Sequence, residues 1–390
     1  MSDSALLSKL KKMPPWKLVL GVLGAALALT MPFWGFTKNI EGPLPIATVV
    51  LCAVYALFAL GLNIVVGFAG LLDLGYVAFF LFGAYVGAWL MSDFAINVTE
   101  GWEDLNFAFL STAKDGALGI HLSFWIVIIV AAVVAAIAGV VIGWPTLKLK
   151  SDYLALVTLG FGEILPEVFR NGNDYAGYNL TNGTKGIGPV DAIGTKSISW
   201  LPIFTDKIGK TDYKARYYVI LVFCLLFAWV SIKLRDGRLG RAWMAIREDE
   251  LAASLMGVPL RKSKLWSYAV GAAAGGVGGA FYATVVGTVN VDTFTFQFSI
   301  IILCAVILGG MGNVWGAILG AVVITWLSDN GLKWMGNEVG TNLVKYQFGI
   351  FGLILVLMML FRPEGLLPAA RAAEVKQAEL KAAAALEGQS

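Results

Sequence analysis

Residues 120–144 read IHLSFWIVIIVAAVVAAIAGVVIGW, and this stretch decides the fold class. It contains no Asp, Glu, Lys or Arg, and it exceeds the roughly 20 residues that an α-helix needs to cross a bilayer. The whole chain of 390 residues is 58% hydrophobic and only 14% charged. A soluble domain carries about 25% charged residues. The composition therefore excludes a soluble enzyme, a disordered chain and a disulfide scaffold.

Nine further apolar segments flank this stretch, so the sequence predicts an all-α polytopic membrane protein with about ten transmembrane segments. The ten segments lie at 17–36, 44–66, 75–92, 120–144, 152–170, 216–234, 265–289, 298–311, 314–328 and 346–361. The first is longer than the apolar core of a signal peptide, so we expect it to stay as a helix. The short pair at 298–328, separated by glycines, is typical either of a re-entrant hairpin lining a cavity or of two tilted crossings.

The positions of Lys and Arg predict the orientation, because cytoplasmic loops carry the excess of basic residues. The connection at 233–264 holds eight basic residues, whereas the loop at 93–119 holds five acidic residues and one basic. The sequence therefore predicts that both termini are cytoplasmic and that the loops at 93–119 and 171–213 are external. The expected parts are a cytoplasmic tail at 1–16, a membrane domain at 17–361 with a cytoplasmic loop at 235–264, and a second cytoplasmic tail at 362–390.

Glycine patterns suggest internal symmetry and close helix packing. The predicted orientation makes segments two to five and seven to ten inverted repeats, which place a substrate path between the halves. The glycines at 67–87 resemble those at 309–320 in their spacing, which supports this symmetry. Gly271, Gly275 and Gly279 recur every four residues, a spacing that lets helices approach closely in lipid.

The connection at 233–264 reads KLRDGRLGRAWMAIREDELAASLMGVPLRKSK. Residues 241–256 lack Pro and Gly and predict one helix, which Gly257 and Pro259 end. The helix has charges in its first half and small apolar residues in its second. Such a helix fits docking into the groove of a partner, and it equally fits an interfacial helix with flanking positive charges.

Five strings in this order resemble the LivM-type branched-chain amino acid permeases, and together they span about residues 45–367. The strings are Gly70-Leu71-Leu72-Asp73-Leu74-Gly75, Thr158-Leu159-Gly160-Phe161-Gly162-Glu163-Ile164, Gly240-Arg241-Ala242 through Glu250, Leu308-Gly309-Gly310-Met311-Gly312, and Phe361-Arg362-Pro363-Glu364-Gly365-Leu366. Glu250 to Gly257 also resembles the EAA-type loop of ABC importer permeases, with one residue inserted after the Glu.

This resemblance implies a transmembrane permease of an ATP-binding-cassette importer in the bacterial inner membrane. It implies four kinds of partner: a second related permease (LivH-type), two cytoplasmic ATPase subunits, a periplasmic substrate-binding protein and membrane lipid, with no nucleic acid. The chain itself is then no enzyme and holds no cofactor or metal, because ATP and Mg²⁺ lie on the ATPase subunits. By motif match, the ATPase-coupling residues are Arg241, Arg247, Glu248, Glu250, Ala253 and Gly257.

Polar residues within membrane segments, and breaks in those segments, are the candidates for the translocation pathway or a gate. The candidates are Asn63, Asp73, Glu163, Gly310 and Gly312. Glu163 is expected to lie deepest, on the same helix face as Glu167. The alternatives are structural: a buried hydrogen bond for Glu163, and an N-terminal helix cap for Asp73.

The residues leave the cargo open. Branched-chain amino acids are the first expectation, and urea or short amides are the alternative within the same family. A stand-alone ion-coupled secondary transporter is the alternative outside it, although such a protein does not need the charged helix at 241–256. Gly209-Lys210-Thr211 ends like a phosphate-binding loop, but Phe204 stands where that loop needs its first glycine, which argues against ATP binding by this chain.

Overall fold

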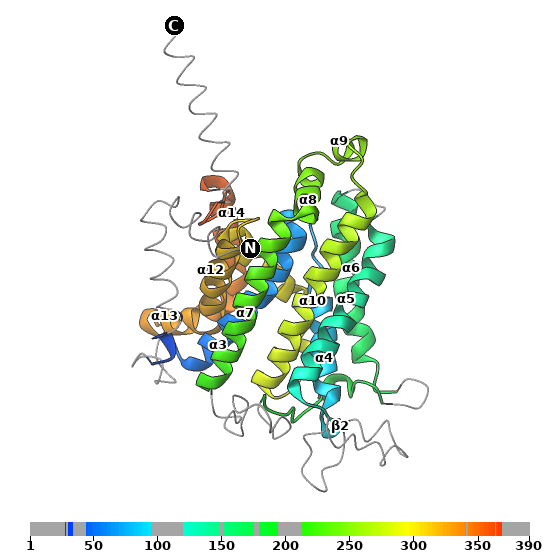
Figure 1. Ribbon diagram of the computed structural model, residues 1–390. Helices are drawn as coiled ribbons and strands as arrows, with labels where there is room; N and C mark the ends of the chain where they lie inside the picture. Colours follow the sequence, from blue (N-terminus) through cyan, green and yellow to red (C-terminus); the bar gives the residue numbers. More distant parts are fainter. Residues whose placement is uncertain are drawn as a thin grey trace, which may run out of the picture.

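The computed structural model is a bundle of helices, most of them roughly parallel to one axis (Figure 1). The described residues are 28, 30–33, 44–94, 120–147, 151–174, 179–193, 213–340, 342–362 and 364–368. The α-helices are α3 (Ile46–Leu62), α4 (Val77–Leu90), α5 (Phe124–Thr146), α6 (Ser151–Arg170), α7 (Tyr213–Asp236), α8 (Arg238–Glu248), α9 (Glu250–Leu255), α10 (Leu260–Val286), α11 (Phe296–Gly309), α12 (Val314–Trp326), α13 (Leu332–Val339) and α14 (Gln347–Phe361).

Shorter elements connect or extend these helices. π-Helical turns continue α3 as η3 (Asn63–Phe68) and α12 as η8 (Leu327–Gly331). The 3₁₀ turns are η1 (Met31–Phe33), η5 (Gly183–Lys185), η7 (Val291–Thr293) and η9 (Leu343–Tyr346). Two-residue strands β1 (Met91–Ser92) and β2 (Ile120–His121) pair in antiparallel fashion.

Every apolar segment predicted from residue 44 onward is helical, which confirms an all-α membrane protein. Within the described residues, five helical stretches are long and apolar enough to cross a membrane. They are Ile46–Phe68, Phe124–Thr146, Tyr213–Asp236, Leu260–Val286 and Leu343–Phe361. Two further apolar helices, α4 and α11, are shorter. The tails at 1–16 and 369–390, most of the first segment and most of the two predicted external loops lie outside the described residues.

The helices run between two ends of the bundle. At one end, which we call the α9 end, Arg247 contacts Gly67 after α3, and Gly312 after α11 contacts Asn63. At the other, the β-end, β1 pairs with β2, and the Asp191 amide donates to the Met91 carbonyl at 2.8 Å. Consecutive long helices alternate in direction between these ends, as Figure 1 shows, which agrees with successive crossings.

The glycines of α10 bring it close to its neighbours, as their spacing predicted. A Cβ built at Gly83 of α4 would lie 2.1 Å from the Gly276 carbonyl oxygen of α10, so only glycine allows this contact. Likewise, a Cβ at Gly271 would lie 2.5 Å from a methyl carbon of Val65. Close approach maximises van der Waals packing where lipid supplies no hydrophobic driving force. α10 therefore lies at the centre, packed on α3, α4 and α5.

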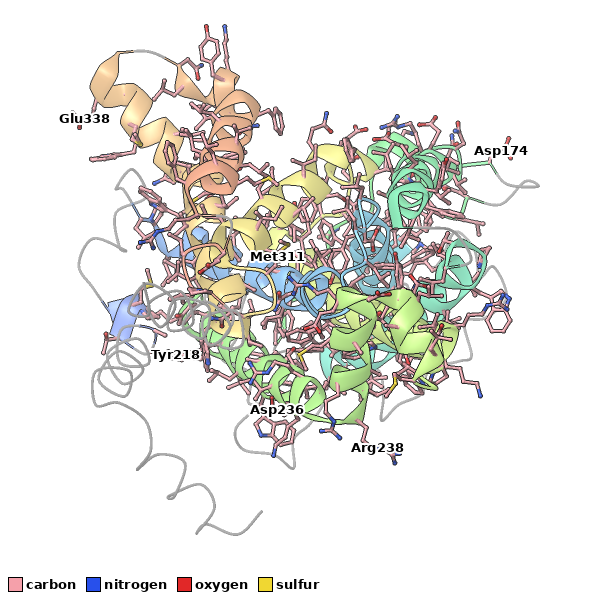
Figure 2. All side chains as sticks on the ribbon, turned by 90° about the horizontal axis from the view of Figure 1, so that it is seen from above. Asp174, Tyr218, Asp236, Arg238, Met311 and Glu338 are labelled. Carbon is pink, nitrogen blue, oxygen red and sulfur yellow. The ribbon has the colours of Figure 1, made fainter. Side chains whose placement is uncertain are left out.

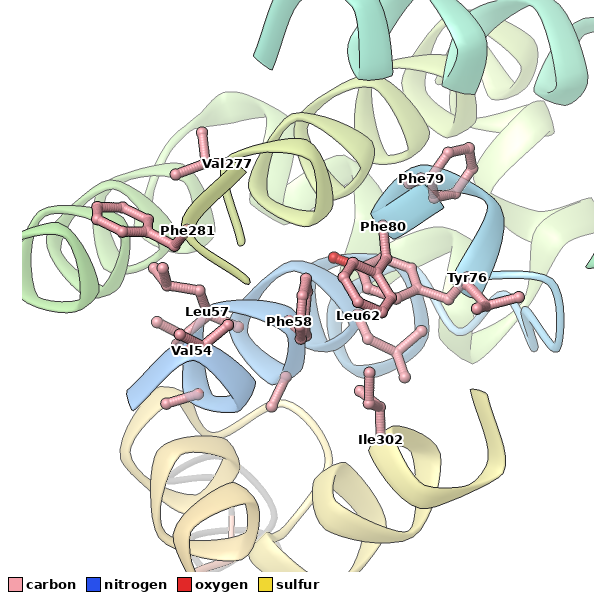
Figure 3. Close-up of a cluster of buried hydrophobic side chains, with 14 of the residues drawn as sticks. Val54, Leu57, Phe58, Leu62, Tyr76, Phe79, Phe80, Val277, Phe281 and Ile302 are labelled. Atoms are coloured by element: carbon pink, nitrogen blue, oxygen red, sulfur yellow. The ribbon is translucent and has the colours of Figure 1, made fainter. Parts of the chain in front are cut away.

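Aromatic rings fill the space between α3, α4 and α11 (Figure 3). Phe58 and Phe80 are both fully buried, and their ring centroids lie 4.6 Å apart. Phe298 stacks on Phe80 with centroids 4.6 Å apart. Such ring pairs add to the free energy of packing beyond the area they bury. This cluster joins the first helices of the chain to its C-terminal third.

The pair at 298–328 forms two antiparallel helices, α11 of 14 residues and α12 of 13 residues. α11 begins next to η7, whose Asp292 pairs with Arg170 at the β-end, and it ends at the break 310–313. α12 returns from that break, and Asp329 just beyond it accepts a hydrogen bond from Thr48 Oγ1 at the start of α3. Both interpretations of the pair, a re-entrant hairpin and two crossings, stay predictions.

One argument for inverted repeats is wrong. The glycine-rich connections at 67–75 and 309–313 lie at the same end and touch each other, since Gly312 N donates to Asn63 Oδ1. An inverted repeat would place corresponding connections at opposite ends. The similar glycines therefore reflect similar close packing, and the repeats themselves stay a prediction.

The three cysteines, Cys52, Cys224 and Cys304, are free and buried within the bundle. Each lies in a helix, as their apolar sequence surroundings indicated. No disulfide joins any two of them.

Candidate functional site

The segment between α7 and α10 folds into two short helices, α8 and α9, at one end of the bundle (Figure 1). α8 is anchored by Trp243, which is fully buried and whose Nε1 donates to the Ser263 carbonyl at 2.7 Å. Its first turn packs tightly, because a Cβ at Gly240 would lie 2.1 Å from the Arg235 carbonyl oxygen. α8 is therefore fixed to both neighbouring long helices.

The predicted single helix over 241–256 is wrong, because Asp249 divides it. Asp249 has an extended backbone (φ −156°, ψ 112°), and its carboxylate accepts from Leu251 N at 2.8 Å and Ala252 N at 3.0 Å. Asp side chains favour such capping over the interior of a helix. The helix stop is confirmed at Gly257, which adopts φ +80° just before Pro259.

α9 presents apolar side chains to its surroundings. Leu251 is 71% exposed, Leu255 80% and Met256 85%. Ala253 faces the other way and is buried. Exposed large apolar side chains gathered on one short helix are typical of a docking site for another protein. α9 thus combines a buried attachment face with an exposed apolar face.

Two charged contacts attach this unit to the rest of the bundle. Arg247 Nη1 donates to the Gly67 carbonyl at 2.5 Å, and Lys264 Nζ lies 2.6 Å from Glu250 Oε1. Lys264 is only 4% exposed, so Glu250 balances a buried cation. Arg241 donates to the Asp236 carbonyl at 3.1 Å on the exposed side, and Glu248 is exposed. The six predicted coupling residues therefore lie together in one unit.

Three predicted pathway residues meet at the α9 end. Asn63 is fully buried, and its Oδ1 accepts from Gly312 N at 2.9 Å. A Cβ at Gly310 would lie 2.3 Å from the Leu367 carbonyl oxygen, so the C-terminal segment 364–368 covers the break. Figure 2 looks onto this end, with Met311 of the break near the middle and Arg238 of α8 at the margin. In this structure these residues make packing contacts.

Asp73 lies apart from them, in the connection between η3 and α4. Its side chain is 2% exposed, and Oδ1 accepts from Gly75 N at 2.9 Å. α4 begins at Val77 after Tyr76, so Asp73 closes a turn before the helix and does not cap it as one alternative predicted. The neighbouring Leu74 amide donates to Thr158 Oγ1, which ties this connection to α6.

Glu163 is exposed on α6. Glu167 is also exposed and pairs with Arg170 at 2.9 Å. The alternative of a buried hydrogen bond within this chain is therefore wrong for Glu163, because the face of α6 that carries it points out of the bundle, and its place on the pathway stays a prediction. Tyr153 and Ile164 are exposed on this helix as well, at 62% and 58%.

Sequence reasoning missed two clusters. In the sequence Lys264 is only one of the basic residues of the predicted cytoplasmic loop. Glu250 lies 14 residues before it, on the other side of the helix stop at Gly257, so the chain can fold back and pair the two. The second cluster is at the β-end, where buried His121 lies between two carboxylates, 2.5 Å from Asp191 and 3.0 Å from Asp93. Only the fold brings these three positions together. Among the described residues, no group of three or more His, Cys, Asp or Glu is arranged to hold a metal ion.

A family model described as "Branched-chain amino acid transport system / permease component" matches residues 44–361. The chain belongs to this permease family. The LivM permease protein of the high-affinity branched-chain amino acid transport system of Escherichia coli (strain K12) is 33% identical over 89% of this chain and 74% of its own length. A probable LivM of Methanocaldococcus jannaschii is 24% identical over 80% of this chain and 90% of its own length.

The chain is also similar to permease proteins named LivH. The LivH permease protein of Salmonella typhimurium is 22% identical over 82% of this chain and 92% of its own length. No solved structure matches the chain. Family membership and the apolar helices together identify a multi-pass membrane protein that acts as a permease component of a transport system.

Proposed function

We propose that this permease is one subunit of an ATP-binding-cassette importer that carries leucine, isoleucine and valine across the bacterial inner membrane. The observation that carries the proposal is the α8–α9 unit. It holds an exposed apolar helix on a buried anchor, with Trp243 and Lys264 fixing it to α10. A permease that works alone has no need of such a docking element.

The proposed assembly contains a second, LivH-type permease, two ATPase subunits that bind ATP and Mg²⁺, and a periplasmic binding protein. The basic residues at 233–264 support a cytoplasmic position for the α9 end, where the ATPases would lie. Ten crossings, with both termini in the cytoplasm, agree with this orientation and with the alternating helices. The β-end then faces the periplasm and receives the binding protein.

The proposed coupling runs through α9. Its exposed leucines and Met256 dock on an ATPase subunit, so that closure of the ATPase pair moves α9. The Glu250–Lys264 pair transfers this movement to α10, and Arg247 transfers it to the end of α3. The permease pair then alternates between outward and inward openings.

The exposed face of α6 is the proposed wall of the translocation pathway. A carboxylate at the centre of a bilayer costs about 2.5–3.5 kcal/mol on insertion scales. Glu163 is therefore unfavourable against lipid, and protein or water covers this face. The second permease, packed across α6, supplies that cover and leaves a polar path between the two chains.

Uptake of labelled leucine tests the proposed function. It is measured at low micromolar leucine in cells that lack the gene and in cells that have it restored. Loss and rescue are expected, with competition by valine and isoleucine. Unchanged uptake would count against leucine as cargo and make urea the next label.

The coupling assignment has its own variant. Glu250→Arg sets a second cation against buried Lys264 and is expected to abolish uptake and the ATPase response while the complex still assembles. Glu338→Arg is the control, because it makes the same exchange at an exposed position of α13. Normal uptake by Glu250→Arg would contradict the assignment.

A further inference from the structure

Asn63 begins the π-helical turn η3 and is fully buried at the α9 end. Its Oδ1 accepts the 2.9 Å hydrogen bond from Gly312 N, across 249 residues of sequence. π-Helical turns are often found at functional sites, where they interrupt the regular hydrogen-bond ladder. This single bond joins the irregular end of α3 to the break between α11 and α12.

Gly67 lies directly between this bond and α8. A Cβ at Gly67 would lie 2.1 Å from Asn63 Oδ1 and 2.6 Å from Gly312 N. The carbonyl of the same glycine accepts the 2.5 Å hydrogen bond from Arg247 Nη1. Gly70, at φ +69°, also lies close to Arg247, because a Cβ built on it would lie 2.7 Å from Arg247 Cγ. α8 therefore rests on the turn that Asn63 begins.

The break at 310–313 and the end of α11 also contact the C-terminal segment 364–368 and the start of α12. The Leu366 amide donates to the Leu308 carbonyl at 2.8 Å, and the Leu367 amide donates to the Gly309 carbonyl at 2.9 Å. Asn313 caps α12 through Trp315 N at 3.0 Å and donates to the Leu367 carbonyl at 3.1 Å. A displacement of the break therefore reaches α11, α12 and the C-terminal segment together.

The other atom of the Asn63 amide is a buried donor. Nδ2 is buried and has no hydrogen-bond partner in the described structure. Buried side-chain donors are nearly always paired, because an unpaired one loses its hydrogen bonds to water without replacement. A second position of the break that offers an acceptor to Nδ2 would remove this deficit.

We propose that Asn63 is a positioning residue that transmits the movement of α8 to the break at 310–313. The inference rests on the proposed function, since an ATP-driven partner must move α8. Arg247 pushes or pulls the Gly67 carbonyl, the turn η3 shifts, and the Asn63–Gly312 bond carries the shift to α11 and α12. Asn63 touches no substrate in this role.

The test uses the complete importer complex in liposomes, with Asn63→Ala, Asn63→Asp and the control Thr325→Val. Thr325 is 3% exposed, and its hydroxyl has no partner among the described residues, so its loss matches the removal of a buried polar group outside the relay. Four quantities are measured: yield of assembled complex, ATPase activity alone, ATPase activity with leucine-loaded binding protein, and leucine uptake.

For Asn63→Ala we expect normal yield, ATPase activity alone within about twofold of wild type, and an approximately tenfold loss of both stimulated ATPase and uptake. Asn63→Asp keeps the acceptor Oδ1 and should retain most of the uptake, and Thr325→Val should match wild type. Combining Asn63→Ala with Arg247→Ala should give no further loss, because residues of one relay are non-additive.

Three results would overturn the inference: normal stimulation in Asn63→Ala, additive losses in the double variant, or a fall in uptake that only follows a fall in yield. In each of these the wild-type complex still imports leucine, so the proposed function stands. A wild-type complex whose ATPase ignores leucine-loaded binding protein would instead overturn the proposed function, and this inference with it.

Discussion

α10 and α14 are both long apolar helices, yet they occupy opposite environments. In the most apolar window of α10, 67% of residues are buried, against 6% in the stretch Leu343–Phe361 that contains α14. α14 has the higher mean hydropathy of the two. In this protein hydropathy therefore indicates compatibility with lipid and not burial, because lipid tails are as apolar as the protein core.

Small residues account for the difference. Gly276 of α10 has no room for a Cβ, which would lie 2.5 Å from the Ala131 carbonyl oxygen of α5. Gly349 and Gly352 of α14 have no atom within 4 Å of a built Cβ. A helix lies at the centre of this bundle when its neighbours can approach its backbone, and among the described residues these two glycines of α14 have no such neighbour.

The largest expected difference comes from filling the two kinds of glycine. Gly276→Leu should cost more than about 3 kcal/mol, above the usual range for overpacking, because the Ala131 backbone of α5 would have to move away from α10. Gly352→Leu is the matched control and should leave folding unchanged. The check is the fraction of monodisperse protein on size-exclusion chromatography in detergent. Equal fractions for the two variants would contradict the claim that α10 and α14 differ in packing.

Truncating one aromatic residue in each region should give the next largest difference. Phe58→Ala should destabilise the bundle by about 3 kcal/mol, since it opens a cavity in the ring cluster. Phe361→Ala, at a side chain that is 74% exposed, should stay within about 0.5 kcal/mol. Thermal unfolding of the detergent-solubilised chain measures both, and a similar loss for Phe361 would show that α14 is buried by some other contact.

Removing one tyrosine hydroxyl that contacts α10 and one next to α14 should give a smaller difference. Tyr76 Oη donates to the Gly271 carbonyl of α10 at 2.9 Å in a buried position. Tyr76→Phe should therefore cost about 1 kcal/mol. Tyr346→Phe, next to α14 and 63% exposed, should cost nothing measurable by the same unfolding assay. Equal midpoints for the two variants would rule out a contribution from the Tyr76 bond.

The smallest expected effects have opposite signs. Gly275→Ala should destabilise slightly, because its Cβ would lie 3.1 Å from Phe79 Cβ. Gly349→Ala should stabilise by about 0.5–1 kcal/mol, since Ala loses less conformational entropy than Gly in an open helix position. If the thermal unfolding midpoints of both variants shift in the same direction, the space around these glycines does not decide whether alanine stabilises or destabilises the protein.

The sequence predicted the helices well, because an uncharged run of sufficient length has few other stable structures in lipid. The six residues predicted for coupling, from Arg241 to Gly257, are close in sequence and lie together in and beside α8 and α9, and their coupling role stays a prediction. The helix break at Asp249 was missed, although an Asp followed by helix-forming residues is a capping signal. The propensity of 241–256 for helix outweighed that signal in the prediction.

The surroundings of individual side chains were harder to predict than the helices that carry them. Glu163 lies in the middle of its predicted segment, but the periodicity of α6 does not say whether its polar face meets this chain or another. Lys264 counted as a loop charge, and only the packing of α9 against α10 buries it. The Asn63–Gly312 bond joins positions 249 residues apart, a contact that no local pattern reveals.

The burial of Cys52, Cys224 and Cys304 has a practical consequence. Thiol reagents attack a thiolate that solvent can reach, so the native chain is a nearly silent background for maleimide dyes. A cysteine placed at Met256, which is 85% exposed, then carries a fluorophore without prior removal of the natural thiols. Its emission would follow the surroundings of α9 in real time as the importer works through its cycle.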